Sequence, residues 1–164
     1  MKQDYINAIA YFNHDTIKGK ITFRQYKNDK DVCVIFDLHG IYETMAIHIH
    51  EYGDESEGCM SLGGHWNPSN KNHGSIFMDK ENSHAGDLIN NLYPPKDGSG
   101  DYFLIYYDDR IQLYGNVLES IIGRSVVIHF GIDDLGLGGN EESLKSGNSG
   151  ERKACSIIGH MKKE

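Results

Sequence analysis

Positive charge is scarce in this chain of 164 residues: Lys and Arg number 16 against 24 Asp and Glu, and the formal net charge at pH 7 is -8. Proteins hold nucleic acid largely through Lys and Arg on its phosphates, so this balance argues against a nucleic-acid partner. It also argues mildly against an anionic substrate, unless a local field overrides the net charge.

Long hydrophobic runs are absent too, since no stretch approaches the roughly 18 apolar residues of a membrane span. The opening residues, MKQDYINAIAYFN, hold no long apolar core and no small-residue cleavage signal, so we expect no signal peptide. We therefore expect no membrane association and a cytoplasmic location. The Ile-, Asn- and Lys-rich composition would suit an AT-rich genome, including that of a large DNA virus, and the location would then be the host cytoplasm.

Proline and cysteine are also rare. Three prolines beside 19 glycines indicate many turns rather than long helices. The three cysteines, Cys33, Cys59 and Cys155, allow at most one intrachain disulfide and leave one thiol over. In a cytoplasmic protein, free buried thiols are the ordinary expectation. The length suits a single domain over residues 1–164.

Short runs of alternating or β-branched residues, separated by turn signals such as HDTIKG and KNDKD, make up most of the remaining sequence. This pattern predicts an all-β fold, an antiparallel sandwich or barrel, and no helix of appreciable length. The predicted strands cover residues 5–13, 17–26, 31–38, 45–51, 87–92, 102–107, 110–114, 125–129 and 153–161.

Two stretches lose the alternating pattern. Residues 52–86 are rich in Gly, Asn and Ser, and residues 131–151 are Gly-rich and charged. Irregular loops of this length are uncommon in compact domains and are usually either functional or disordered. Cys59, Trp66 and three histidines argue against disorder in the first stretch, so we expect two long functional loops on the β scaffold.

Histidines gather in and beside these stretches. His48 and His50 are spaced i, i+2 in a predicted strand, so both imidazoles face the same way, opposite Ile47 and Ile49. His129 closes the run SVVIH, and taken alone it could simply end a strand.

The first loop adds a group of another kind, which ends in the segment HAGD. His84 and Asp87 are an i, i+3 pair that can converge on one ion, and His65 and His73 precede them. Three histidines and one carboxylate fit a closed tetrahedral zinc site.

Taken together, these seven residues predict ligands for two ions. An all-imidazole set suits Cu(II), whereas the set with a carboxylate suits zinc. Two sites of four ligands need one shared residue, and His65 is the natural bridge because both nitrogens of an imidazole can bind metal. The copper set is His48, His50, His65 and His129, and the zinc set is His65, His73, His84 and Asp87.

Around these ligands the sequence resembles the copper/zinc superoxide dismutase family over nearly the whole chain. The segments that carry the resemblance are HIHEYGD (48–54), GCMSLGGHWNP (58–68), NHG (72–74), HAGDL (84–88), IIGRSVVIH (121–129), DDLGLGGNEES (133–143) and GNSGERKACSIIG (147–159). The resemblance implies an eight-stranded Greek-key β-barrel or sandwich, immunoglobulin-like in architecture, with one copper and one zinc ion per subunit. It implies an enzyme that disproportionates superoxide to O₂ and hydrogen peroxide as copper cycles between Cu(II) and Cu(I), with zinc structural.

The resemblance also assigns roles outside the ligand set. Asp133 would join a copper histidine to a zinc histidine, Arg152 would hold the anionic substrate, and His65 would deliver a proton to the product. Cys59 and Cys155 would form a disulfide that contributes roughly 4–5 kcal/mol in the chain-entropy model. Cys33 would then be a small buried residue.

The charged residues Glu141, Glu142 and Lys145 of the second loop would shape the field that guides superoxide. Such guidance depends on the local field in a channel rather than on net charge, which answers the objection raised by the value of -8. The alternative is that this charged stretch is simply a solvated loop.

The resemblance further implies a homodimer, through a patch near Gly53, Ile122 and Gly123. His160 weakens this expectation, because relatives bury an apolar residue at that position.

A copper chaperone could deliver the metal. A proline beside the channel arginine accompanies dependence on the chaperone in some relatives, and Glu151 and Lys153 stand there instead, which indicates tolerance of its loss. The alternative function is an inactive superoxide-dismutase-like module or decoy that binds such a chaperone. Those proteins usually lose a copper ligand or the arginine, so the complete set here favours the enzyme.

Overall fold

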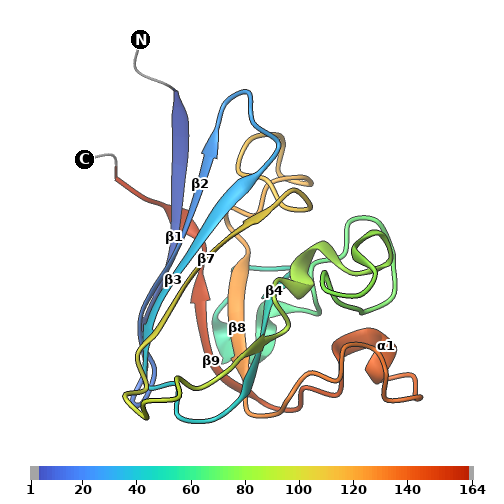
Figure 1. Cartoon of the computed structure of the whole chain (residues 1–164). Coiled ribbons are helices and arrows are strands. Elements are labelled where there is room, and N and C mark those ends of the chain that lie inside the picture. Colours follow the sequence, from blue (N-terminus) through green and yellow to red (C-terminus); the bar gives the residue numbers. More distant parts are fainter. Residues whose placement is uncertain (1–3, 163–164) are drawn as a thin grey trace.

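The computed structural model describes residues 4–162, which form two antiparallel sheets packed face to face. In Figure 1 the five-stranded sheet lies on the left and the four-stranded sheet in the middle. The first has the order β10 (Gly159–His160), β1 (Tyr5–Asn13), β2 (Lys18–Tyr26), β3 (Val32–His39) and β7 (Tyr102–Asp108). The second has the order β6 (Asn91–Leu92), β4 (Met45–His50), β8 (Ser125–His129) and β9 (Arg152–Ile157).

The connections follow a Greek key, because β7 returns to pair with β3 after the chain has crossed to the other sheet and back. β9 and β10 are separated by Ile158 alone and together make the predicted last strand. Counted as one, they bring the strands of the two sheets to the eight that the resemblance implies. A further short strand, β5 (Ser56–Cys59), lies in the first long loop.

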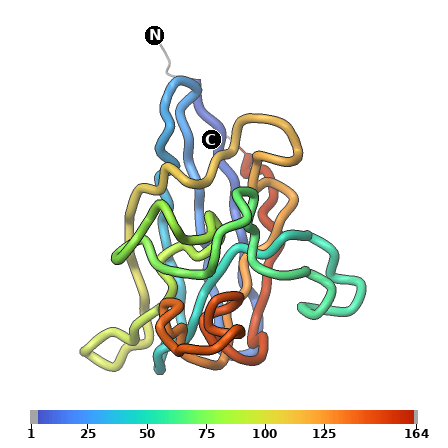
Figure 2. Tube along the Cα trace, turned by 90° about the vertical axis from the view of Figure 1, so that its right-hand side faces the viewer, coloured from blue at the N-terminus to red at the C-terminus, as the bar shows by residue number. Residues whose placement is uncertain are grey.

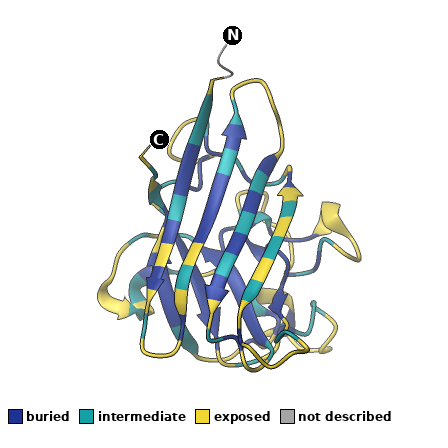
Figure 3. Cartoon of the chain, turned by 60° about the vertical axis from the view of Figure 1, so that its left-hand side comes forward, coloured by how far each residue is buried: buried dark blue, intermediate teal, exposed yellow. Residues whose placement is uncertain are grey.

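Alternation along the strands places the core between the sheets. In β1, Ala8, Ala10 and Phe12 are fully buried, and Ala8 pairs across the ladder with the buried Phe23 of β2. Figure 3 shows the opposite face of the five-stranded sheet, where β7 carries exposed bands along its length. The strand β4 is buried throughout because its second face is covered by loops rather than by solvent.

The two long loops lie on the side of the molecule away from the five-stranded sheet, at the right of Figure 1 and in front in Figure 2. Their regular pieces are short: three 3₁₀ turns, η1 (Met60–Leu62), η2 (Lys80–Asn82) and η3 (Ala85–Asp87), and one helix, α1 (Ser143–Ser146). No helix within residues 4–162 has the length and apolar character needed to cross a membrane.

The prediction of a strand at residues 110–114 is wrong. The backbone N–H of Leu113 and that of Tyr114 donate to the side-chain oxygen of Gln25, at 2.7 and 3.3 Å. A buried glutamine thus takes the place of a neighbouring strand. The predicted strand 87–92 is also mostly absent, because η3 and a turn occupy its first part and only β6 remains.

The expectation that Cys33 is buried is also wrong. It lies on the outer face of β3, opposite Tyr107 of β7, and is partly exposed. The burial pattern of β3 alternates, and Cys33 falls on the outward parity with Ile35.

Candidate metal centre

The seven predicted ligands come together as two buried groups that share one residue. In each group, one ligand atom from every member lies within 4.8 Å of the others. His65 belongs to both groups, as its place in the sequence predicts. The imidazole group contains His48, His50, His65 and His129, and the carboxylate group contains His65, His73, His84 and Asp87.

The strands β4 and β8 set the imidazole group. His48 and His50 project from the outer face of β4, while Ile47 and Ile49 enter the core. A register shift between Ile128 and His129 marks the end of β8, where the last ligand of this group stands. The first long loop joins the sheet by the isolated bridge between His50 and His65.

Backbone carbonyls orient two of the four imidazoles. His50 donates from Nδ1 to the carbonyl of Gly63 at 2.9 Å, and His129 donates from Nδ1 to the carbonyl of Gly150 at 3.0 Å. Their Nε2 atoms then face each other at 3.3 Å as two lone pairs. Two acceptors at this distance are unfavourable unless they share a cation or a proton.

The other two imidazoles present nitrogen atoms with no partner. His48 donates from Nε2 to Asp133 at 2.7 Å, so its Nδ1 keeps a lone pair. This Nδ1 and the Nε2 of His65 are buried and make no hydrogen bond within the described chain. Because orphaned buried polar atoms are costly, they need a partner that is not a protein group. The donor set therefore fits a metal ion held by four imidazole nitrogens.

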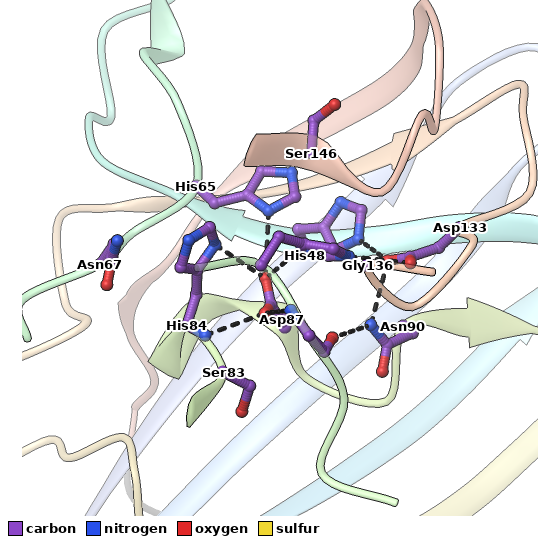
Figure 4. A network of polar contacts seen from close by, with 12 residues as sticks. His48, His65, Asn67, Ser83, His84, Asp87, Asn90, Asp133, Gly136 and Ser146 are labelled. Atoms are coloured by element: carbon purple, nitrogen blue, oxygen red, sulfur yellow. Dashed lines mark hydrogen bonds and ion pairs between the residues drawn. The ribbon is translucent and has the colours of Figure 1, made fainter. Parts of the chain in front are cut away.

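The carboxylate group is built around Asp87, which Figure 4 shows with dashed lines running to the surrounding side chains. One carboxylate oxygen lies 3.1 Å from Nδ1 of His65, 2.8 Å from Nδ1 of His73 and 3.1 Å from Nδ1 of His84. The other oxygen accepts the backbone N–H of His84 at 2.9 Å and that of Gly74 at 3.0 Å. This anchor leaves one oxygen and three imidazole nitrogens for an ion.

Two of these imidazoles are also held by hydrogen bonds from the ring nitrogen that does not face Asp87. His73 donates from Nε2 to Asp133 at 2.8 Å, and His84 donates from Nε2 to the carbonyl of Lys71 at 3.0 Å. Both Nδ1 atoms are then free to act as ligands. Three nitrogens and one oxygen fit the tetrahedral zinc set that the sequence predicts.

Burial and charge shift the pKa of His73 in the opposite direction from the pKa values of the imidazole group. Burial, reinforced by the neighbouring imidazoles, lowers the pKa of His129 to about 4 and holds those of His48 and His50 well below the ordinary value. Burial also opposes the charged form of His73, but hydrogen bonds to Asp133 and Asp87 outweigh it and raise its pKa to about 9. Three imidazole hydrogen bonds likewise overcome burial and depress the pKa of Asp87.

Asp133 lies where the sequence predicts a link between the groups. It is 3% exposed, and its two oxygens accept from His48 and His73. Asn90 donates to the same carboxylate at 3.0 Å, and Asn91 exchanges two hydrogen bonds with the backbone of Asp133. Sequence reasoning did not single out these asparagines, although the pair NN directly follows the ligand segment HAGDLI.

Gly147 shows why the second loop needs glycine at the point where it covers this link. Its φ is +66°, and a Cβ there would lie 2.3 Å from Oδ1 of Asp133 and 2.5 Å from Nε2 of His73. A side chain would therefore push the loop off both groups.

Arg152 lies beside the imidazole group, at the start of β9. Its guanidinium donates to the carbonyls of Cys59 and Gly63. The structure contains the disulfide between Cys59 and Cys155, separated by 96 residues, which ties the first long loop to β9. Hydrogen bonds to two carbonyls of the first long loop thus fix the arginine beside the imidazole group.

A cavity of about 640 Å³ opens onto the imidazole group and is lined by His50, His65, His129 and Arg152. Glu142 and Lys145 of the second loop line it as well. Glu141 is not among the lining residues; its carboxylate lies 3.7 Å from Lys145, and both side chains are largely exposed.

Fold and site together define a class: an all-β sandwich metalloprotein with two adjoining metal groups joined by one histidine. Comparison with known proteins agrees with this class. The family described as copper/zinc superoxide dismutase (SODC) matches residues 17–158. The chain therefore belongs to the copper/zinc superoxide dismutase family.

Individual relatives give the same result over nearly the full length. "Superoxide dismutase [Cu-Zn]" of Schizosaccharomyces pombe is 43% identical over 157 residues, covering 94% of this chain and 97% of the relative. The protein of the same description from Talaromyces marneffei is 40% identical over the same shares. The crystal structure of "the clock protein EA4" superposes with a TM-score of 0.85, at 40% identity, over 94% of each chain.

Proposed function

We propose that this chain is a superoxide dismutase, which converts two superoxide ions and two protons to O₂ and hydrogen peroxide. The observation that carries the proposal is the pair of buried ligand groups that share His65, one of which opens to a cavity lined by Arg152. Membership of the copper/zinc superoxide dismutase family supports it. The alternative of an inactive module is not favoured, because the ligand set and the arginine are complete.

We assign one copper and one zinc ion to each chain. Copper would be held by the imidazole group, His48, His50, His65 and His129, and zinc by the carboxylate group, His65, His73, His84 and Asp87. The copper ion, when bound, supplies the one-electron redox chemistry, whereas zinc has no redox chemistry of its own and is structural.

The protein's own residues would bind the anion and move the proton. The Arg152 guanidinium faces the cavity with a positive charge, and its hydrogen bonds to two carbonyls hold it in place. His65 would hold a proton at Nε2 and release it towards the departing peroxide, while its Nδ1 stays fixed on the carboxylate side. Asp133 would keep His48 and His73 in the tautomers that the two groups require.

The second loop would guide superoxide towards this cavity. Lys145 lines the cavity with Glu142, and Glu141 lies within 3.7 Å of Lys145, so the acidic pair and the lysine set the local field there. We propose this guidance role for all three residues, in place of a merely solvated loop.

For assembly we propose a homodimer through the face around Gly53 and Gly123. The two loops touch closely, since a Cβ at Gly53 would lie 2.4 Å from the Gly123 carbonyl oxygen, and Ile157 beside them is 39% exposed. His160 is exposed and weakens this face. A monomer mass at micromolar concentration would remove the proposal. We further propose a cytoplasmic location, a single domain over the chain, and copper loading that survives loss of a chaperone.

Metal content and superoxide consumption measured on one sample test the main proposal. We expect near one copper and one zinc per chain, and His48→Ala should lose copper and activity while keeping zinc. His39→Ala is the matched control, because that histidine is exposed, its imidazole pairs with the exposed Asp101, and it belongs to neither ligand group. A protein with both metals bound and no activity would contradict the enzymatic proposal.

A further inference from the structure

Arg110 lies outside the ligand set, in the turn after β7, yet it makes several contacts with the segment around η3. Its Nη1 donates to Oγ of Ser83 and to the carbonyl of His84, both at 3.0 Å, and its Nη2 donates to the carbonyl of Leu88 at 3.2 Å. The side chain is only 9% exposed. One guanidinium therefore bonds to three residues of a six-residue stretch.

That stretch is the turn η3, with its flanking residues, which carries two ligands of the carboxylate group. Ser83 precedes the ligand His84, and Leu88 follows the ligand Asp87. Arg110 thus holds the residue before the first ligand, the backbone of that ligand, and the residue after the second. The Nδ1 atom of His84 and Oδ1 of Asp87, 3.1 Å apart, lie within the segment that it closes.

The backbone of Leu88 gives a second, independent observation. Its φ is 46° with ψ of -124°, a conformation that a leucine rarely adopts. Such a conformation costs about 1–3 kcal/mol and persists only where the surroundings impose it. The hydrogen bond from Arg110 to the Leu88 carbonyl is one of those constraints, and this strained residue directly follows Asp87.

Asp108 fixes the guanidinium from the opposite side. It is 3% exposed and accepts from Nε of Arg110 at 2.9 Å and from Nη2 at 2.7 Å, the bidentate geometry of a strong ion pair. Asp108 ends β7 and pairs with Val32 of β3, so it belongs to the rigid five-stranded sheet. Through this ion pair the five-stranded sheet anchors the segment around η3, which covers the four-stranded sheet.

We propose that Arg110, held by Asp108, is a positioning residue for the carboxylate metal group. It orders η3 so that His84 and Asp87 face His65 and His73 before an ion arrives, and it slows release of that ion. The inference rests on the assignment of zinc to this group. The alternative is that the ion pair between Arg110 and Asp108 stabilises the fold and leaves metal affinity unchanged.

The experiment compares zinc affinity with fold stability in three variants. Removing Arg110 alone would leave Asp108 buried without its partner, which can unfold a protein for reasons unrelated to metal. The double variant Asp108→Asn/Arg110→Met removes both charges, and Arg110→Lys keeps the charge but loses the planar fork. Arg24→Met is the matched control, because Arg24 bonds to Asn7 and stacks on Tyr5, on strands that carry no ligand.

Zinc affinity would be measured by competition with a chromophoric chelator. The geometry of the group would be followed in the visible spectrum of Co²⁺ bound in place of zinc, and the unfolding midpoint would be taken on metal-free protein. We expect the double variant to lose about 10- to 100-fold in zinc affinity and to change the Co²⁺ spectrum, since supporting contacts of this kind have such effects. Arg110→Lys should fall between it and the native protein, with the control unchanged.

Zinc affinity within twofold of native in the folded double variant, with the same Co²⁺ spectrum, would overturn the proposal even if the unfolding midpoint fell. Should the double variant not fold, Arg110→Lys decides by the same two measurements, and full native affinity would overturn the geometric role. The affinity ratio can be measured whether or not the native protein consumes superoxide. Failure of this inference is thus distinguishable from failure of the proposed enzyme activity.

Discussion

The imidazole group and the carboxylate group share His65 but solve the problem of a buried polar cluster in opposite ways. The imidazole group contains no charged ligand, and burial holds the pKa of His129 at about 4 and those of His48 and His50 well below the ordinary value. The carboxylate group contains the anion of Asp87, and the pKa of His73 rises to about 9. One group therefore favours neutral side chains and the other favours charge separation.

The difference teaches how one fold can hold two ions for two purposes. Neutral imidazoles impose no fixed charge, so the net charge of a bound ion can change without a buried carboxylate opposing it. Asp87, with its second oxygen on two backbone amides, neutralises part of a divalent charge permanently and suits an ion that does not change. The comparison predicts that substitution of a ligand in the imidazole group and substitution of one in the carboxylate group remove different metals and different properties.

The largest effect should follow from His129→Ala in the imidazole group. Copper binding should fail and superoxide turnover should drop below about one hundredth of native, since even supporting contacts are worth 10- to 100-fold. Zinc should remain near one per chain, because His129 belongs only to the imidazole group. Metal analysis with a turnover assay measures the copper content, the zinc content and the activity. Equal loss of the two metals would contradict the assignment of copper to one group and zinc to the other.

Asp87→Asn should produce the opposite result. Zinc should be lost, and with it the stabilisation that bound metal contributes, about 4 kcal/mol when free zinc is 1,000 times its dissociation constant. For a chain of this size that corresponds to a fall in Tm of roughly 8–16 °C. Calorimetry on zinc-loaded protein measures it; a Tm equal to native would mean that the carboxylate group has no structural role.

Asp133→Asn should weaken both groups together, by about 10-fold or more in metal affinity, because Asp133 accepts from His48 in one and His73 in the other. Chelator competition for copper and for zinc in the same variant makes the test. Loss confined to one metal would show that Asp133 does not couple the groups.

The pH dependence of the metal-free chain should be largest on the acid side. The pKa of His129 is about 4 in the folded chain against an ordinary value of 6.5, so the unfolded chain binds more protons between these values and stability falls as the pH drops from 6.5 to 4. This histidine alone accounts for about 3 kcal/mol.

The raised pKa of His73, about 9, contributes stability that is complete below pH 6.5 and is lost towards pH 9. The free energy of unfolding of demetallated protein, measured by denaturant titration, should be largest near pH 6.5. A free energy that changed with pH in one direction only would contradict the opposite pKa shifts of His129 and His73.

The smallest effect should come from Lys145→Glu at the mouth of the cavity, next to the imidazole group. Turnover should fall severalfold at low ionic strength and approach native at high salt, because screening removes the contribution of an exposed charge. Lys162→Glu is the control, since that lysine does not line the cavity. An unchanged rate at low salt would count against guidance by the loop.

The convergence of the seven candidate ligands was predictable because each constraint on their spacing is local or carried by a motif. The i, i+2 spacing of His48 and His50 in a strand and the i, i+3 spacing of His84 and Asp87 fix which side chains can converge. The all-β fold followed from alternation of a similar kind, and it is confirmed in the two sheets.

What failed, or was missed, depends on single side chains that reach across the fold. Gln25 occupies the backbone N–H groups of Leu113 and Tyr114 from 88 and 89 residues away, so a segment with a strand pattern forms no strand. Arg110 and Asn90 support the metal groups through contacts that no local spacing encodes. Alternation along β3 placed Cys33 on the outward face, and its apolar neighbours in sequence concealed this.

Anomalous scattering from crystals of the metal-loaded protein, recorded on both sides of the copper and zinc absorption edges, tests the central claim most directly. The account predicts a copper peak among His48, His50, His65 and His129, and a zinc peak among His65, His73, His84 and Asp87. Copper in the carboxylate group with zinc in the imidazole group, or one metal in both after loading with equimolar copper and zinc, would contradict it.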